Sequence, residues 1–338
     1  MSLLLACARK TSDPDALPTL PVHNPKTSST IFLGGLWCFI FAIWSTLRIF
    51  LNTVVDIVVF MAILLFLKDT KSPIKGTLGV EHNPKRFVHK TISLDDIKLV
   101  KNALNTTVND VILGVTQAGL SRYLNRRYAN EDDKDEVEKH KTNNLPKRIR
   151  LNVTVMVSIR PAAGIQVLAD MMAKNSKANW GNRVGYIIVP FTIALEDDPL
   201  DYVRGAKAIV DRKKQSLEAI FTHQEINVVS KTFGVKAVAA LVHRVFSNTT
   251  MTFSSMVGPQ EEISYYGHPI AYIAPTVYGL PHALIVHTQS YINKLTICLA
   301  VDPSVIPDPH QLCADLEESL DIIKNAVLEK GLLIKETA

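Results

Sequence analysis

Apolar residues recur at helical spacing between residues 106 and 123, in the stretch TTVNDVILGVTQAGLSRY. Its polar edge is narrow, so the pattern predicts a helix that is mostly buried. The remaining elements are expected to pack around two apolar sides, formed by Val108, Val111, Ile112, Val115 and Gly119 on one side and by Leu113, Leu120 and Leu124 on the other.

The first turn of this helix differs chemically from the rest. Thr106 or Thr107 is placed to cap the helix start, and Asp110 suits the positive end of the helix dipole. Hydrogen bonding and charge at a helix start are therefore enough to explain Asn109 and Asp110 as capping residues. A functional role for the pair stays open beside that explanation.

From residue 85 onward the pattern is that of an α/β domain. Short β-branched or alternating runs predict strands at 86–91, 149–159, 184–191, 250–256, 270–277, 283–291 and 295–301. Helical spacing and start signals predict helices near 94–104, 199–221, 225–246 and 308–328. The charged stretch 128–146 is expected to be a solvated insertion. Strands and helices that alternate and end in a hairpin and a helix suit a mixed sheet.

The most apolar segment lies between residues 31 and 67. Its uncharged first part, 31–47, is at the lower limit for a helix that spans a membrane. Arg48, Asn52 and Asp56 interrupt the remainder. Hydropathy alone predicts one span, and the lysines that follow the segment would place the C-terminal part of the chain in the cytosol.

Composition supports contact with a membrane and argues against other classes of partner. Hydrophobic residues make up 47% of the 338 residues, and the mean hydropathy is +0.13. The net charge of +5 is mild, and no stretch combines clustered Lys and Arg with aromatic residues, so a nucleic-acid interface is not expected. An anionic membrane surface or a phosphorylated cosubstrate fits this charge.

The cysteines indicate neither a metal site nor a disulfide framework. Cys7, Cys38, Cys298 and Cys313 show no C-x-x-C spacing and have no local histidine partner. Thiols scattered among apolar residues are typical of core positions in a reducing compartment. We therefore expect no bound metal.

Four segments, in order, resemble the plant branch of the wax ester synthase/diacylglycerol acyltransferase family. They are TVNDVILGVTQAGLSRYL in the central helix, NWGNRVGY at 179–186, SSMVGPQEEI at 254–263 and LAVDPSVIPDPHQLCADLEESLDIIK at 299–324. The resemblance covers essentially the whole chain, and four ordered segments are more specific than any single motif.

The resemblance implies a fold and a domain organisation. The fold is α/β, a mixed-sheet lobe like those of coenzyme A-dependent acyltransferases such as chloramphenicol acetyltransferase and condensation domains, with an N-terminal hydrophobic helical segment. Residues 1–30 would be a remnant of an N-terminal lobe with its linker. Residues 31–67 would form a membrane-associated or buried helical segment, and residues 80–338 the C-terminal lobe.

The implied activity is O-acyl transfer. A fatty acyl group would move from acyl-CoA, as a cosubstrate, to a long-chain alcohol or diacylglycerol, in wax ester and triacylglycerol synthesis. No cofactor would be bound permanently. The implied location is the endoplasmic reticulum membrane or the plasma membrane, with the C-terminal lobe in the cytosol.

The resemblance also assigns candidate site residues. Asn109 and Asp110 fall on the family's Asn-Asp helix, and Ser255, Gly258 and Pro259 fall on a segment expected to line the substrate tunnel. The family commonly has Asn where this chain has Ser255, which puts a role for that side chain in doubt.

The family's presumed general base, in a His-His-x-x-x-Asp-Gly motif, has no counterpart in this sequence. None of the ten histidines adjoins another, and none is followed four residues later by Asp. No catalytic residue is therefore expected in this chain. We keep two alternatives: a truncated product of an acyltransferase gene, whose first residues end a helix that began before Met1, or a catalytically inactive fragment or binding partner with the same fold.

A shared tunnel constrains the hydrophobic segment, because both lobes must lie on one side of the membrane. A single span would separate them, and Asp56 at mid-bilayer would cost about 2.5–3.5 kcal/mol on insertion scales. We therefore expect a helix that lies in the membrane plane or packs on protein, or two helices hinged near residues 51–53. A spanning helix remains the alternative.

Overall fold

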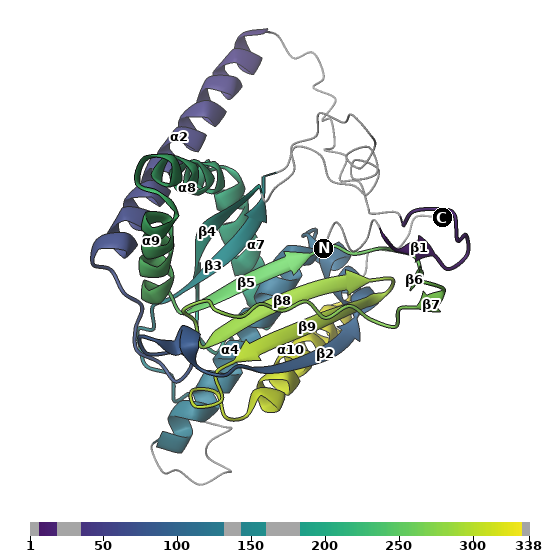
Figure 1. Ribbon diagram of the computed structural model, residues 1–338. Coiled ribbons are helices and arrows are strands. Elements are labelled where there is room, and N and C mark those ends of the chain that lie inside the picture. Colours follow the sequence, from purple (N-terminus) through teal and green to yellow (C-terminus); the bar gives the residue numbers. More distant parts are fainter. Residues whose placement is uncertain (1–6, 19–34, 132–142, 160–182, 333–338) are drawn as a thin grey trace.

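A mixed sheet with the strand order β2-β9-β8-β5-β3-β4 forms the centre of the structure (Figure 1). The computed structural model describes residues 7–18, 35–131, 143–159 and 183–332. β5 is parallel to β3 and β8, and the other neighbouring strands are antiparallel. The strands are β2 (Arg86–Ser93), β3 (Leu151–Ser158), β4 (Val184–Phe191), β5 (Met251–Met256), β8 (Leu284–Tyr291) and β9 (Lys294–Val301).

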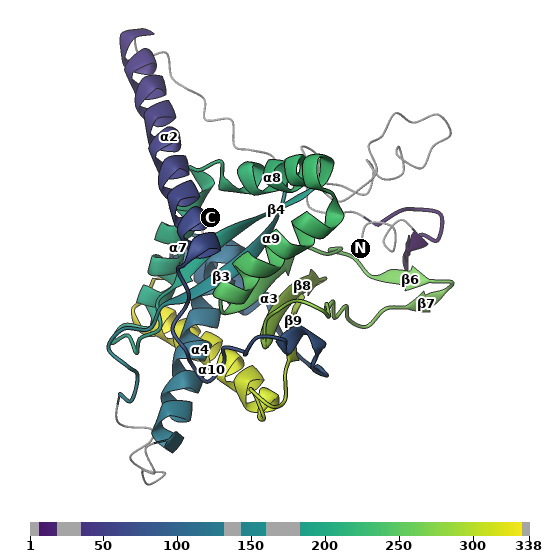
Figure 2. The same cartoon turned by 60° about the vertical axis from the view of Figure 1, so that its left-hand side comes forward.

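Helices cover the two faces of this sheet in two groups (Figure 2). One group shares the main hydrophobic core with the sheet, and comprises α3 (Leu94–Ala103), α4 (Val108–Glu131), α7 (Leu200–Lys214) and α10 (Pro309–Glu329). The other packs on the opposite face beside β4, and comprises α2 (Gly35–Leu65), α8 (Glu218–Phe233) and α9 (Val235–Asn248). A short 3₁₀ helix, η1 (Val80–His82), follows α2.

The central helix α4 is buried as predicted, and glycines allow its neighbours to approach closely. A Cβ atom on Gly114 would lie 2.8 Å from Cα of Val203 in α7. On Gly119 it would lie 2.7 Å from Cδ2 of Leu316 in α10. Such distances are too short for a side chain, so glycine at these positions permits the contact of α4 with both helices.

All of the predicted strands except the one at 270–277 are confirmed. Residues 270–277, predicted as a strand, form none; the segment 270–282 runs across β8 and β9 (Figure 1), where Tyr272 stacks on His89 with ring centroids 4.9 Å apart. A small sheet was not predicted, because its strands offer too few positions for a pattern: β1 (Arg9–Lys10), β6 (Ile263–Tyr265) and β7 (His268–Pro269).

Helix boundaries differ more than strand boundaries. The region predicted as two long helices forms three, α7, α8 and α9, and the last break is at Gly234, where φ is 82°. The first residues of the chain were expected to end a helix, and this expectation is wrong for Arg9 and Lys10, which form β1. α4 continues to Glu131, and residues 132–142 of the expected insertion lie outside the described residues.

The hydrophobic segment forms one continuous helix, α2, so the hinge expected near residues 51–53 is wrong. By length and composition α2 could cross a membrane. The C-terminal half of α2 packs on α8 and α9 through Phe60 and Ile63. The N-terminal half of α2 projects beyond the sheet and beyond the other helices (Figure 2). Trp37 is 69% exposed and Phe41 is 72% exposed, which leaves a large apolar surface on the projecting part.

Three polar residues in the middle of α2, Asn52, Thr53 and Asp56, contact other parts of the protein. Asp56 is buried, and one of its carboxylate oxygens accepts from Arg212 Nη2 at 2.8 Å and from Lys213 Nζ at 2.9 Å. Lys213 Nζ also donates to Glu218 at 2.6 Å, and Glu218 accepts from the backbone N–H of Ile188 in β4. This buried cluster links α2, α7, α8 and the sheet.

Two further contacts hold α2 to the loop between α7 and α8. Asn52 Nδ2 donates to the carbonyl oxygen of Gln215 at 3.1 Å, and Thr53 Oγ1 accepts from the N–H of Leu217 at 3.0 Å. Of the three interrupting residues singled out in the sequence, Asn52 and Asp56 thus have partners within the protein, while Arg48 is exposed.

Asp56→Ala should lower the free energy of unfolding by about 1.5–3 kcal/mol, because it removes charge-assisted hydrogen bonds from the buried cluster while Lys213 keeps Glu218 as its partner. Urea unfolding in detergent, followed by circular dichroism, measures this change. The matched control is Asp211→Ala, which removes an exposed carboxylate paired with Lys207 at 2.6 Å and should cost less than about 1 kcal/mol. Equal losses in the two variants would contradict the buried-cluster argument.

Glu225 of α8 is a partly buried acid. Neither Glu225 Oε2 nor the hydroxyl of Tyr186 has a hydrogen-bond partner among the described residues. Burial raises the pKa of Glu225 from 4.5 to about 7. The folded protein therefore retains a proton at Glu225 that the unfolded chain loses near pH 4.5. The stability that this protonation contributes is present below pH 4.5 and is lost as the pH rises through about 7.

Glu225→Gln should remove this pH dependence, because glutamine resembles the protonated acid and stays neutral. The variant should be more stable than the parent at pH 8, by roughly 1–3 kcal/mol, and similar to it at pH 4.5. Thermal unfolding at both pH values measures the difference. Glu329→Gln, at an exposed position, is the control, and an equal gain at pH 8 there would refute the assignment to Glu225.

Candidate functional site

A cavity of about 900 Å³ opens where the parallel strands β5 and β8 end and α4 begins. Four of the five predicted site residues line it: Asn109 from α4, Ser255 from β5, and Gly258 and Pro259 directly after β5. Asp110 does not. The structure therefore brings together residues separated by almost 150 positions in the chain.

Asn109 and Ser255 touch directly. The hydroxyl of Ser255 donates to Oδ1 of Asn109 at 2.9 Å. This bond leaves the amide NH₂ group of Asn109 as a donor at the cavity. Ser255 stands where the family commonly has Asn, which put its role in doubt. Its side chain nevertheless contacts Asn109 in the first turn of α4.

Asp110 caps the start of α4. Its side chain is fully buried, and its Oδ2 accepts from the N–H of Thr107 at 2.8 Å. Thr107 Oγ1 in turn accepts from the N–H of Asp110 at 3.3 Å. This reciprocal pair is a capping box, so Thr107 is the cap among the two threonines considered. The capping interpretation holds for Asp110 but not for Asn109, which lines the cavity.

Gly258 and Pro259 fix the exit of β5 against the end of β8. A Cβ atom on Gly258 would lie 2.0 Å from the carbonyl oxygen of Ser290, which no side chain could tolerate. The N–H of Gly258 donates to Ser290 Oγ at 3.1 Å, and the carbonyl of Pro259 accepts from the N–H of Ile292 at 2.9 Å. This close approach gives the cavity its wall.

Lysines on one side of the cavity were not singled out in the sequence. Lys98 and Lys101 come from α3, and Lys214 ends α7. Lys98 Nζ bonds to Asp95 at 3.0 Å and to Asn293 at 3.2 Å. Lys214 Nζ pairs with Asp211 at 3.4 Å. The described lining holds three ammonium groups against one carboxylate, Asp95, so this side of the cavity, called its mouth below, is basic. No sequence motif marks them, because they are adjacent only in the folded chain.

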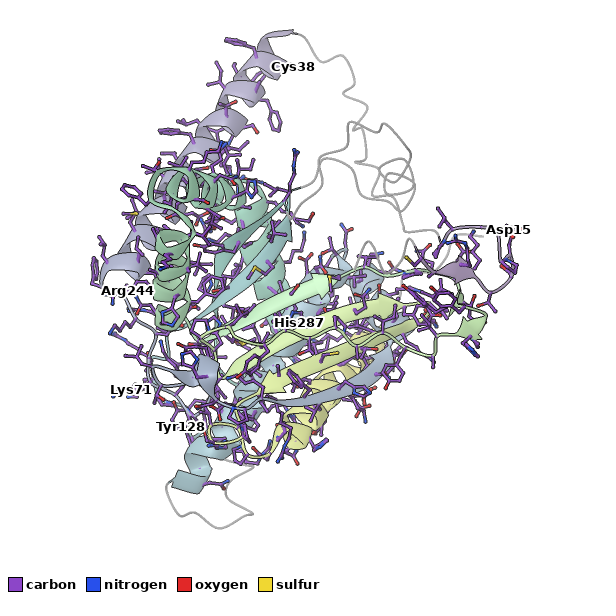
Figure 3. The ribbon with its side chains drawn as sticks, viewed as in Figure 1. Asp15, Cys38, Lys71, Tyr128, Arg244 and His287 are labelled. Carbon is purple, nitrogen blue, oxygen red and sulfur yellow. The ribbon has the colours of Figure 1, made fainter. Side chains whose placement is uncertain are left out.

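The described lining residues offer polar contacts, and the one carboxylate among them, Asp95, is bonded to Lys98 and Asn293. They include no histidine or cysteine, and the described part of the chain holds no cluster of metal-binding side chains. Two histidines are buried elsewhere: His282 bonds to Thr249 and Thr252, and burial lowers its pKa to about 3, while His287 lies at the centre of the sheet (Figure 3). The cavity can bind and orient a substrate.

Comparison with known sequences identifies the family. Residues 180–324 match the WS/DGAT C-terminal domain. The chain is 53% identical over 335 residues to wax ester synthase/diacylglycerol acyltransferase 11 of Arabidopsis thaliana, covering 98% of this chain and 68% of that protein. It is 54% identical over 339 residues to wax ester synthase/diacylglycerol acyltransferase 5 of the same plant, covering 98% and 66%. The chain belongs to the wax ester synthase/diacylglycerol acyltransferase family.

This membership, with the mixed sheet and the apolar helix α2, confirms the acyltransferase-like fold expected from the sequence. The chain spans about two thirds of the length of these relatives. Among solved structures it resembles the wax ester synthase/diacylglycerol acyltransferase from Marinobacter aquaeolei VT8, with a TM-score of 0.49, 16% identity and coverage of 76% of this chain and 52% of that one.

The residues that carried the resemblance fall in distinct places in the fold. The family-model match begins before β4 and ends in α10, so it includes Ser255 and Gly258 but not α4. The Asn-Asp helix is covered by the match to the Arabidopsis relatives. Residues 179–182 of the segment NWGNRVGY lie outside the described residues.

The two members of the Asn-Asp pair should behave differently when replaced. Asp110→Ala removes a cap and should lower the free energy of unfolding by about 1–2 kcal/mol. Asn109→Ala should change it by less than about 0.5 kcal/mol, because Asn109 lies at the cavity surface. Urea unfolding of both variants tests this contrast, and a larger loss for Asn109→Ala would return both residues to a structural role.

Proposed function

We propose that this chain, through residues 80–338, forms the C-terminal lobe of an O-acyltransferase. The enzyme would move a fatty acyl group from acyl-CoA to a long-chain alcohol or diacylglycerol, forming wax esters or triacylglycerols. Residues 1–30 would belong to the end of an N-terminal lobe and its linker. The names of the Arabidopsis relatives support this proposal. The observation that carries it is the convergence of Asn109, Ser255, Gly258 and Pro259 on one cavity.

In the reaction implied by the family, a histidine of the other lobe removes the proton of the acceptor hydroxyl. The oxygen attacks the thioester carbonyl, the C–S bond breaks, and the coenzyme A thiolate leaves and takes up a proton. This chain contributes binding and orientation. Asn109 and Ser255 present polar groups at the cavity, while Val108, Ile112 and Leu295 provide an apolar wall that suits an acyl chain and excludes water.

The basic mouth supports acyl-CoA as the cosubstrate. Coenzyme A carries phosphate groups, and ammonium groups bind phosphates as point charges. Lys101 and Lys214 lie at the mouth on opposite helices, α3 and α7. Their placement lets the phosphates stay at the surface while the acyl chain enters the apolar cavity. We propose no permanently bound cofactor.

Helix α2 supports contact with a membrane, at the endoplasmic reticulum or the plasma membrane, with the C-terminal lobe on the cytosolic side. Its exposed residues include Trp37, Phe41 and Trp44, which are typical of membrane-facing surfaces. Asp56 and its ion partners favour an arrangement in which protein covers the polar side of α2 and lipid covers the apolar side. We propose that α2 holds the cavity next to its lipid substrates.

The activity test uses two proteins: the chain alone, and the chain preceded by the N-terminal lobe of its relative wax ester synthase/diacylglycerol acyltransferase 11. The chain alone contains no His-x-x-x-Asp sequence. It should form no ester from acyl-CoA above background, whereas the joined protein should. Asn109→Ala in the joined protein should reduce turnover about 10-fold or more, beyond any change in stability.

Two further outcomes separate this proposal from its alternative. Lys101→Gln with Lys214→Gln should raise the KM for acyl-CoA, and leave KM for the alcohol unchanged. Robust turnover by the chain alone would show that the chain holds its own base. A joined protein that binds acyl-CoA without turnover would instead favour an inactive binding partner with the same fold.

A further inference from the structure

A second cavity, of about 840 Å³, lies apart from the candidate site, at the C-terminal end of α2. One wall is the segment 68–78 that follows the helix, and the other is the segment 247–250 between α9 and β5. Neither the proposed reaction nor the candidate site residues involve it. Lys68, Lys71 and Lys75 all line this cavity.

Lysines after a helix often bind its last carbonyl groups, but here other residues do so. Arg244 of α9 donates to the carbonyl oxygens of Leu64 and Leu65, at 3.2 and 3.3 Å. Asn248 Nδ2 donates to the carbonyl of Ile63 at 2.6 Å. The end of α2 therefore does not need the ammonium groups of the cavity.

The three lysines differ in what they already bind. Lys75 donates to the backbone carbonyls of Asn248 and Asp69, at 3.1 and 3.4 Å, and helps to build the cavity. Lys68 and Lys71 are exposed, and the described residues give neither of them an ion pair. Figure 3 shows Lys71 and Arg244 on the same side of the molecule, around the end of α2.

The carboxylates of the cavity both have partners within the protein. Asp69 is buried and accepts from the N–H and Nδ2 of Asn152 and from Thr250 Oγ1, at 2.6–2.7 Å. Glu81 Oε1 pairs with His243 at 2.9 Å. Glu81 Oε2 and Ser72 Oγ are both buried with no hydrogen-bond partner among the described residues, and Ser72 is the one of the two that can donate. The cavity thus offers two free cations and a free hydroxyl, which suit an anion.

Apolar surface borders this basic cavity. Phe66, two residues before Lys68, is 70% exposed, and Leu78, on the cavity wall, is 85% exposed. The exposed apolar residues of α2 extend to its last residue, Leu65, which directly precedes Phe66. Apolar side chains next to unpaired lysines match a membrane interface, where hydrocarbon lies beside phosphate groups.

We infer that this cavity binds the phosphate headgroup of an anionic phospholipid. Lys68 and Lys71 would pair with the phosphate and Ser72 would donate a hydrogen bond, while Phe66 and Leu78 would enter the adjacent hydrocarbon. This inference rests on the membrane contact proposed for α2. It adds that the contact selects anionic lipid, through a site separate from the acyltransferase cavity.

Flotation of the full chain with two kinds of vesicle tests the inference: phosphatidylcholine alone, and phosphatidylcholine with about one third phosphatidylserine. The parent chain should bind the anionic vesicles about 30-fold more tightly. Lys68→Gln with Lys71→Gln should lose most of this preference. Lys231→Gln with Lys236→Gln removes the same charge from the turn between α8 and α9, which points away from α2 (Figure 2), and should keep it.

One variant distinguishes a defined headgroup site from general electrostatic attraction between the lysines and an anionic membrane. Thr77→Trp fills the cavity at an exposed position without changing the charge, and should reduce the preference for anionic vesicles. A full preference in Thr77→Trp, or an equal loss in both lysine pairs, would overturn the assignment to this cavity. Binding of inorganic phosphate without any preference for phosphatidylserine would assign the cavity to soluble phosphate and also overturn it.

Vesicle binding and ester synthesis, measured side by side, distinguish this inference from the proposed function. Binding to neutral vesicles depends on α2, and ester synthesis by the joined protein depends on the acyltransferase cavity. A chain that binds neutral vesicles and supports ester synthesis, but shows no anionic preference, would contradict the headgroup site alone.

Discussion

The burial of α4 on both sides is the constraint on which the candidate site depends. Because α7 and α10 approach this helix at Gly114 and Gly119, its position is fixed relative to the sheet. A buried helix start must satisfy its own N–H groups, and Thr107 and Asp110 do this reciprocally. Asn109, one position earlier than Asp110, is then free to point into the cavity.

The sheet completes the site from the other side. Alternation along β5 places Phe253 and Ser255 on the face that carries α4, and parallel pairing with β8 brings Ser290 next to Gly258. The candidate site residues therefore gather at the C-terminal ends of parallel strands, where many α/β folds bind their ligands. This register gives the cavity its polar contacts from Asn109 and Ser255 and its wall at Gly258.

Sequence patterns predicted all but one of the expected strands and the start of α4, because these features have local signals. The four predicted site residues that line the cavity came from the family resemblance, since no local pattern shows that Asn109 and Ser255 meet. They did not predict the break at Gly234, since the apolar pattern continues through it, nor the path of residues 270–282, whose apolar residues cover the sheet without joining it. The sequence also did not predict which residues pair with Asp56. A carboxylate within an apolar segment indicates a need for a cation, but only the fold shows that Lys213 meets it.

The attachment of α2 has a mechanical consequence. Lys213, which binds Asp56 of α2, is followed in the chain by Lys214, which lines the mouth of the acyltransferase cavity. The last turn of α7 therefore joins α2 directly to the lining of the candidate-site cavity. If α2 contacts a membrane as proposed, the two adjacent lysines would couple the tilt of α2 in the bilayer to the position of Lys214, so bilayer thickness and curvature would affect the shape of the cavity.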